Sequence, residues 1–213
     1  MEKVILGKEI SIEEFMAVAR FHSQVEFSQE YEERVKKSRE IIEVCVEQEK
    51  PVYGTTTGFG ALVSKFISKE EAELLQKNII LTHAVSVGEP MEEEEVRAVL
   101  LMVLQSLGRG VSGVRLEVLE YYRDFLNRNL TPYVPREGSV GYLCVEGHIA
   151  AVLLGEGKAW YEGELLPAKE ALRAAGMQPL TLSYKEGLAL INGTTSPTAL
   201  AAPEQQTLRR LCL

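Results

Sequence analysis

The feature that most constrains the fold is a series of apolar stripes whose residues recur at intervals of three and four. Such spacing places apolar side chains on one face of an α-helix, whereas a half-buried strand would alternate. Ser28 and Ser68 precede two of these stretches, and Ser11 precedes a further predicted helix that runs to about Phe21. Glutamates three residues after Ser11 and Ser68 complete capping boxes. The sequence therefore predicts a mainly α fold. The stripes are Val35, Ile41, Ile42, Cys45 and Val46; Leu74, Leu75, Ile79 and Ile80; Val96, Val99, Leu100, Val103, Leu104 and Leu107; and Leu116, Leu119, Tyr122, Phe125 and Leu126.

A small β component is expected beside the helices. Residues 4–10 are β-rich, and residues 158–166 alternate about Glu162-Gly163, which predicts a hairpin. Proline and glycine punctuate residues 130–141, where we expect irregular backbone. The helix with the stripe from Val96 to Leu107 should begin at Pro90, and shorter helices should cover 147–154, the segment from Ala168 and 186–191.

Composition and charge argue against several classes of function. The 213 residues carry a formal net charge of −8, which argues against nucleic acid and anionic membranes as partners because both require basic patches. No apolar run approaches the roughly 18 residues of a membrane span, and the N-terminus lacks a signal-peptide pattern. Three widely spaced cysteines favour free thiols in a reducing cytosol, so we expect a cytoplasmic protein. His22 and His148 lack metal-ligand spacing, and no metal site is predicted.

Five short blocks follow one another along the chain. They read YGTTTGFG at 53–60, THA at 82–84, GVSGVR at 110–115, GSVG at 138–141 and INGT at 191–194. Their order resembles the histidine and aromatic amino-acid ammonia-lyases, and several such blocks together are more specific than any one of them. The resemblance implies an ammonia-lyase-like N-terminal domain with a small β component and the start of a helical bundle. It covers nearly all of this chain but under half of a family member.

The resemblance implies roles for three side chains. Tyr53 matches the family's loop tyrosine that takes part in proton abstraction, and His83 matches a histidine that contacts substrate and shares proton transfer. Asn192 matches the asparagine that orients the prosthetic group, and it is our candidate for substrate binding. Apart from the resemblance, each residue has a structural interpretation. Tyr53 could be a partly buried aromatic residue that anchors its loop, and His83 could be a core histidine whose hydrogen bonds are satisfied. The implied partner is a small-molecule amino acid, and the implied assembly is a homo-oligomer.

The family's electrophile is missing from its expected place. In the family the GSVG block runs into Ala-Ser-Gly, which cyclises into a methylidene-imidazolone group, but here Gly141 is followed directly by Tyr142. Ring closure needs a glycine nitrogen, and a serine just before that glycine supplies the methylene by dehydration. Tyr142-Leu143-Cys144 offers neither, and Val145 follows Cys144. We therefore predict no such cofactor and interpret Gly141 and Tyr142 as the vestigial electrophile position, with Tyr142 packed where the group would lie.

Residues 108–113 match the dinucleotide fingerprint G-x-G-x-x-G literally. The match follows a predicted helix instead of a strand and lacks an acidic residue about twenty positions on, so we reject a dinucleotide site. The Ser112-Gly113 pair within it has a structural role in the family.

The last residues differ in character from those before them. Pro203 follows an alanine-rich run and a polar stretch comes after it, so we divide the chain into an ammonia-lyase-like region over 1–202 and an atypical tail over 203–213, with a helix ending at Ala202. We interpret the chain as a truncated homologue, not catalytic alone. Two alternatives stay open: an active lyase completed by other chains, and an independently evolved small domain. Apolar side chains expected to promote self-association are Leu188, Leu190, Ile191 and Leu200.

Overall fold

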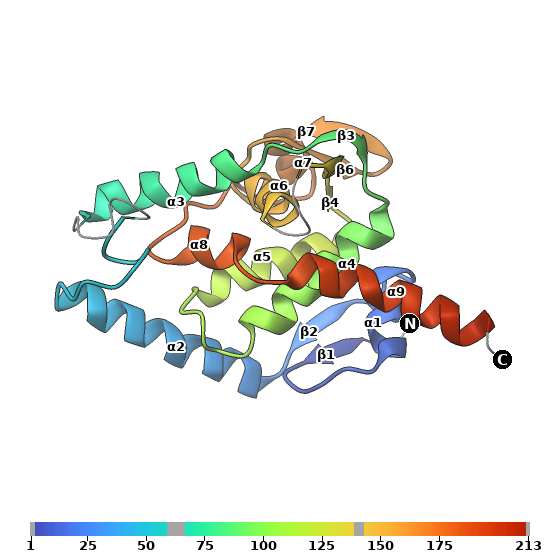
Figure 1. Cartoon of the computed structure of the whole chain (residues 1–213), viewed down its shortest axis with the longest axis horizontal. Coiled ribbons are helices and arrows are strands. Elements are labelled where there is room, and N and C mark those ends of the chain that lie inside the picture. The colour runs from blue at the N-terminus through green and yellow to red at the C-terminus, as the bar shows by residue number, and fades with distance from the viewer. Residues whose placement is uncertain (1–2, 59–66, 139–142, 212–213) are drawn as a thin grey trace.

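The computed structural model describes residues 3–58, 67–138 and 143–211, and most of them are helical (Figure 1). This confirms the predicted mainly α fold. The helices are α1 (Ile12–Ala19), α2 (Gln29–Glu47), α3 (Lys69–His83), α4 (Glu93–Leu107), α5 (Leu116–Asn127), α6 (Cys144–Leu153), α7 (Ala168–Ala174), α8 (Glu186–Ile191) and α9 (Thr195–Leu211). The strands are β1 (Val4–Leu6), β2 (Val25–Phe27), β3 (Val87–Pro90), β4 (Thr131–Pro132), β5 (Pro135–Glu137), β6 (Lys158–Tyr161) and β7 (Glu164–Pro167).

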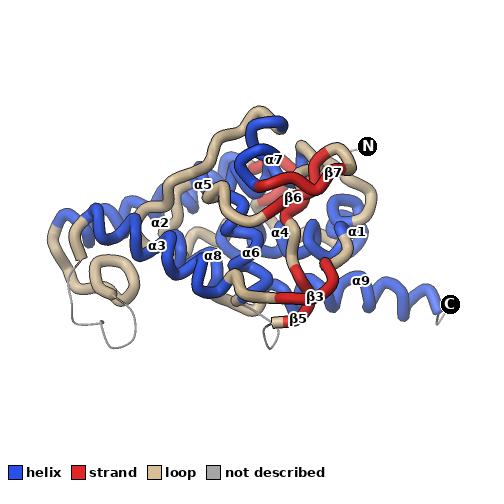
Figure 2. Tube along the Cα trace, turned by 90° about the horizontal axis from the view of Figure 1, so that it is seen from above, coloured by secondary structure: helices blue, strands red, loops and turns tan. Residues whose placement is uncertain are grey.

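The strands form three small sheets, and Figure 2 shows them in the half of the molecule that holds α1 and α9. β1 pairs with β2 in parallel, β3 pairs with β5, and β6 lies between β4 and β7. The predicted hairpin is confirmed as β6–β7. Its turn residues Glu162 and Gly163 have φ values of 50° and 83°, as a two-residue turn that matches the strand twist requires.

Serine caps fix where three helices begin. The hydroxyls of Ser11 and Ser68 accept hydrogen bonds from the amides of Glu14 and Glu71, whose carboxylates return the contact. Ser28 accepts a hydrogen bond from the amide of Tyr31 at the start of α2. Each cap satisfies an amide that the helix itself leaves unpaired, and its removal typically costs about 1 kcal/mol.

The core is built around α4, which packs against α1, α5 and α9 (Figure 1). Its stripe residues Leu100 and Leu104 are fully buried, as is the neighbouring Leu101, and burial of a leucine side chain stabilises the fold by about 1.5–3 kcal/mol. Arg97, about one helical turn after the start of α4, is only 1% exposed. Burial lowers the pKa of its guanidinium.

Arg97 and Asn127 join the N-terminal segment to this core. The Arg97 guanidinium donates hydrogen bonds to the carbonyls of Val18 and Leu126, at 2.9 and 3.1 Å, so it satisfies carbonyls at the ends of α1 and α5. The Asn127 side chain accepts from the amide of Val25 at 2.8 Å and donates to its carbonyl at 2.9 Å. These contacts attach β2 and α1 to α5.

A buried carboxylate holds the start of α8 in place. Glu186, which is fully buried, accepts hydrogen bonds from Nε and Nη2 of Arg115, both at 2.8 Å. Its carboxylate also accepts from the backbone amides of Arg115 at 3.0 Å and Ser183 at 2.7 Å. The hydrogen bond from Arg115 to Glu186 raises the pKa of the guanidinium. This ion pair joins the GVSGVR block to the helix that leads to Asn192.

Three local expectations were wrong. Pro90 lies in β3 and α4 begins only at Glu93, because the capping box formed by Glu92 and Glu95 starts the helix. The segment 130–141 contains β4 and β5, which long-range pairing with β6 and β3 stabilises. The last helix does not end at Ala202, since α9 continues through Pro203 to Leu211. A proline removes one intrahelical hydrogen bond, and the alanines, glutamate and glutamines on either side favour helix.

Within the described residues, no helix combines the length and the apolar character that crossing a bilayer requires.

Candidate functional site

The Tyr53 loop is held by its threonines. The Val52 carbonyl accepts hydrogen bonds from the amides of Thr55 and Thr56, at 3.0 and 3.1 Å, and the Thr56 hydroxyl bonds to the Lys50 carbonyl. The threonines are buried, but the Tyr53 side chain is 52% exposed. About half of the Tyr53 surface is therefore accessible to solvent, at a turn that the threonines stabilise.

His83 is the last residue of α3, and its ring orientation is fixed. Its Nδ1 lies 2.7 Å from the carbonyl oxygen of Ile79. A carbonyl only accepts, so Nδ1 carries the proton in this contact, and Nε2 of the neutral ring keeps a lone pair. Gly147 of α6 touches the His83 backbone, since a Cβ at position 147 would lie 3.0 Å from its carbonyl carbon. His83 thus has the chemistry of an acceptor or base at Nε2.

Asn192 ends α8, and its side chain is exposed. Its backbone is extended, and Gly193 after it has φ 131°, a value that favours glycine. Two residues later α9 begins at Thr195. Asn192 therefore lies in the short link between two helices.

Glu146 organises this link, and sequence reasoning did not identify it. One carboxylate oxygen accepts hydrogen bonds from the Thr195 hydroxyl at 2.5 Å and the Ser196 amide at 2.9 Å. The carboxylate thereby caps α9 from outside the helix. Its other oxygen and the Tyr122 hydroxyl are buried without a partner among the described residues. The pKa of Tyr122 is raised mainly by burial of its hydroxyl and secondly by the nearby charge of Glu146. The signal in the sequence is a lone acidic residue within the apolar run of α6.

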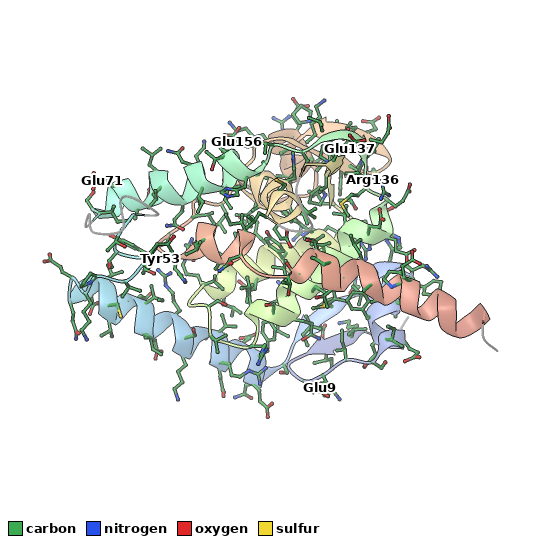
Figure 3. The ribbon with its side chains drawn as sticks, in the orientation of Figure 1. Glu9, Tyr53, Glu71, Arg136, Glu137 and Glu156 are labelled. Atoms are coloured by element: carbon green, nitrogen blue, oxygen red, sulfur yellow. The ribbon has the colours of Figure 1, made fainter. Side chains whose placement is uncertain are left out.

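The structure groups two of the three predicted site residues around α6. The start of α6 contacts the His83 backbone through Gly147 and the segment after Asn192 through Glu146. Tyr53 lies toward the other end of α3, the end that carries Glu71 in Figure 3. There the Ile67 amide donates a hydrogen bond to the Thr56 carbonyl at 3.0 Å. A helix of 15 residues spans roughly 20 Å. Gly141 and Tyr142, the predicted electrophile position, lie outside the described residues.

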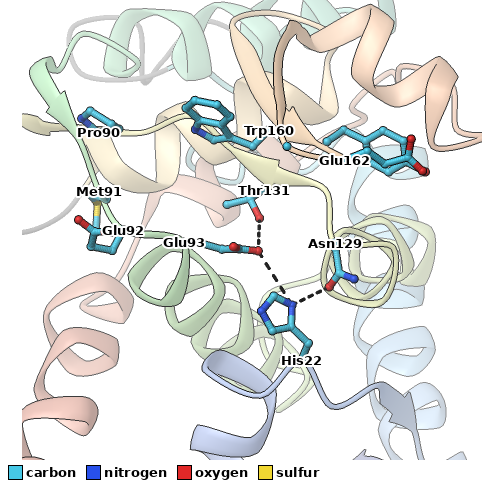
Figure 4. A pocket seen from close by; sticks show the side chains of 11 residues that line it. His22, Pro90, Met91, Glu92, Glu93, Asn129, Thr131, Trp160 and Glu162 are labelled. Carbon is cyan, nitrogen blue, oxygen red and sulfur yellow. Dashed lines mark hydrogen bonds and ion pairs between the residues drawn. The ribbon is translucent and has the colours of Figure 1, made fainter.

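A hollow lies apart from these residues. A cavity of about 420 Å³ lies beside the β6–β7 hairpin, and Figure 4 shows Trp160, Glu93, Thr131 and His22 around it. His22 Nδ1 lies 2.8 Å from the Asn129 side-chain oxygen. Neither Tyr53, His83 nor Asn192 lines this cavity. Within the described part of the chain, histidines, cysteines and carboxylates form no cluster that could hold a metal ion.

The G-x-G-x-x-G match lies between two helices, α4 and α5. Its last glycine, Gly113, has φ 72° and donates its amide to the Ser38 hydroxyl at 3.0 Å. A Cβ there would lie 2.2 Å from Ile42. The glycines serve a tight turn against α2.

Known proteins resemble this chain closely over part of their length. A family model described as aromatic amino acid lyase matches residues 10–213. The histidine ammonia-lyase of Symbiobacterium thermophilum is 47% identical over 205 residues, which cover 95% of this chain and 40% of that protein. Among solved structures, the ergothioneine-degrading enzyme ergothionase of Treponema denticola has a TM-score of 0.93 at 32% identity. The match covers 99% of this chain and 43% of the ergothionase chain.

A third relative acts on a different amino acid. The phenylalanine aminomutase of Pantoea agglomerans has a TM-score of 0.93 at 36% identity. The match covers 99% of this chain and 41% of the aminomutase chain. The chain spans about two fifths of the length of the curated relatives it matches. Because the family model matches nearly the whole sequence, the chain belongs to the aromatic amino acid lyase family.

Proposed function

We propose that this chain is a lyase-family polypeptide, similar to histidine ammonia-lyases, that does not catalyse ammonia elimination by itself. The observation that carries the proposal is the sequence after Gly141, where Ala-Ser-Gly is absent. Ser139 is the only serine between Gly138 and Cys144, and Val140 follows it instead of glycine. A valine nitrogen carries a crowded backbone that disfavours the ring closure.

No neighbouring segment supplies a substitute. α6 begins at Cys144, so Val145 and Glu146 already have helical backbone. The Ser112-Gly113 pair is the other candidate, but the amide of Gly113 is donated to Ser38 in a buried turn. The residues present therefore do not fit a methylidene-imidazolone, and we route no chemical step through one.

The alternative function is an ammonia-lyase that other chains complete. Its support is that Tyr53, His83 and Asn192 are all present, with Nε2 of His83 able to accept a proton. In a completed site, Tyr53 would act as the base, His83 would contact the amino acid and Asn192 would bind it. The substrate would be L-histidine or an aromatic amino acid. A cytoplasmic location, with neither nucleic acid nor membrane as partner, belongs to the same proposal.

We also propose self-association, on a different surface from the one first expected. Leu190 and Ile191 are buried, and Leu188 and Leu200 are partly covered. The exposed apolar side chains instead include Ile41 and Val44 on α2 and Leu74 on α3. Exposed apolar surface of this kind favours association. The division into a region over 1–202 and a tail over 203–213 also stays a proposal.

Intact mass and activity of the purified chain test the central proposal. We expect the mass of the unmodified sequence and no ammonia release from histidine, phenylalanine or tyrosine. Ring formation with dehydration would lower the mass by two molecules of water, and that deficit or any turnover above a blank would overturn the proposal.

A designed insertion provides the matched control. Ala-Ser-Gly placed between Gly141 and Tyr142 restores the chemical requirements for the ring, whereas Ala-Ala-Gly at the same place does not. A water deficit in the first variant alone would show that the assay detects the group when the sequence permits it.

A further inference from the structure

A basic cleft lies between the segment after β1, helix α2 and the C-terminal end of α4. Its cavity measures about 460 Å³. Figure 3 places Glu9, at its rim, on the side of the molecule that carries β1 and α1. The cleft is lined by Gly7, Lys8, Glu9, Tyr31, Arg34, Gln105, Gly108 and Arg109.

The cations of this cleft are not neutralised. Lys8, Arg34 and Arg109 contribute three positive charges, and Glu9 contributes one negative charge. Among the described residues, no carboxylate lies within ion-pair distance of any of the three cations. Arg34 is oriented instead by donating to the Gly7 carbonyl at 2.8 Å. Counted over its lining residues alone, the cleft has a surplus of two positive charges in a chain whose formal net charge is −8, and a cationic lining favours an anion.

A buried donor faces the same region. Nε2 of Gln105 is inaccessible to solvent and has no hydrogen-bond partner among the described residues. A buried polar group without a partner costs about 1–3 kcal/mol, which a bound acceptor would remove. Gln105 therefore lines the cleft with an unpaired amide group, whose nitrogen reaches an acceptor in the cleft after rotation about the last side-chain bond.

An apolar hollow adjoins the basic cleft. It measures about 410 Å³ and shares Glu9 and Gln105 with the cleft. Its other walls are mostly apolar side chains from the start of α1, from α4 and from α9. Those that the argument uses are Ile10, Ile12, Phe15 and Met102. We refer to the two adjoining hollows together as the groove, which has a cationic end and an apolar end that meet at Glu9 and Gln105.

We propose that this groove binds a small amphipathic carboxylate. The carboxylate lies among Lys8, Arg34 and Arg109 and accepts from Gln105, while its hydrocarbon part covers Phe15 and Met102. None of Tyr53, His83 and Asn192 lines the groove, so the proposal does not depend on the proposed lyase-related function.

Titration of the full chain with three probes, followed by calorimetry or amide NMR shifts, tests the proposal. Hexanoate carries both a carboxylate and a hydrocarbon tail. Acetate carries the carboxylate without the tail, and 1-hexanol carries the tail without the charge. We expect hexanoate to bind about tenfold more tightly than acetate, because part of four additional methylenes becomes buried, and we expect 1-hexanol to be weaker than hexanoate. Raising the salt concentration should weaken hexanoate binding.

Substitutions locate the site. Arg109→Gln and Gln105→Leu should each weaken hexanoate binding at least threefold, and Met102→Ser should reduce the preference for hexanoate over acetate. Lys158→Gln, an exposed lysine of β6 outside the groove, is the matched control and should leave affinity unchanged. Thermal unfolding of every variant confirms that it is folded. Absence of saturable hexanoate binding up to roughly 10 mM, or equal losses in Arg109→Gln and Lys158→Gln, would overturn the proposal.

Discussion

Replacement of Glu186 by glutamine should destabilise the chain strongly, even though the two side chains have the same shape. One oxygen of the amide still accepts from the Arg115 backbone amide and Nε. The amide nitrogen, however, faces Nη2 of Arg115 and the Ser183 amide, which lie 2.8 and 2.7 Å from the wild-type oxygen. Three donors then meet with no acceptor, so both hydrogen bonds are lost.

The magnitude follows from these contacts. A hydrogen bond to a charged group contributes about 1.5–3 kcal/mol, and the loss of one member of a buried pair costs about 3–5 kcal/mol. Water can rehydrate part of Arg115, whose side chain is 29% exposed. We therefore expect Glu186→Gln to lower the free energy of unfolding by about 2–4 kcal/mol, equivalent to roughly 5–15 °C in Tm for a chain of this size.

Urea unfolding monitored by circular dichroism measures this difference. Glu117→Gln is the matched control, because Glu117 contacts the same guanidinium at 3.0 Å but its side chain is 49% exposed. Exposed pairs contribute about 0–1 kcal/mol, so this variant should unfold close to wild type. If Glu186→Gln lost less than about 1 kcal/mol, or no more than Glu117→Gln, the buried pair would not be what holds α8.

Three further substitutions test other contacts. Gly108→Ala should cost about 1–3 kcal/mol in urea unfolding, because the new methyl would lie 1.9 Å from the Tyr31 ring. Burial lowers the pKa of His148 in the folded chain. Its contribution to the free energy of unfolding is therefore complete above about pH 6.5 and falls as the pH drops below that value. His148→Asn should flatten the profile of stability against pH between about pH 7 and 5, and an unchanged profile would refute this. Glu146→Ala should cost about 1–2 kcal/mol and accelerate hydrogen exchange of the Ser196 amide more than that of amides in α2.

Local signals predicted the elements that depend on local chemistry. The capped helices that follow Ser11, Ser28 and Ser68 and the hairpin at Glu162 were confirmed because each depends on residues within a few positions of one another. The strand at Pro90 was missed because its partner β5 lies more than 40 residues later. β3 is also exposed along most of its length, so its sequence lacks the alternation of apolar and polar residues that identifies a half-buried strand.

The site was predictable residue by residue but not as an arrangement. The blocks identified Tyr53, His83 and Asn192 as candidates, and their place in the family rests on block order. That α6 contacts the segments of His83 and Asn192 depends on Gly147 and Glu146, whose significance appears only when the helices are packed. From sequence alone, a glycine predicts low helix propensity and a glutamate predicts a solvent-exposed side chain. In α6 tertiary contacts outweigh both tendencies, because Gly147 lies in the helix and Glu146 is buried.

The contacts of Arg97 and Asn127 also have a consequence for synthesis on the ribosome. The Val18 carbonyl accepts a hydrogen bond from Arg97, and the backbone of Val25 bonds to the Asn127 side chain. β1, α1 and β2 leave the exit tunnel before α4 and α5, so they lack these stabilising contacts at first. Domains generally fold as units while the chain grows at about 5–20 residues per second. The segment from β1 to β2 should therefore wait several seconds, with the apolar side chains of β1 and α1 open to chaperones, until α5 has emerged. A nascent chain arrested shortly before Arg97 has left the tunnel should be protease-sensitive from its N-terminus, and one arrested well after Asn127 should be resistant.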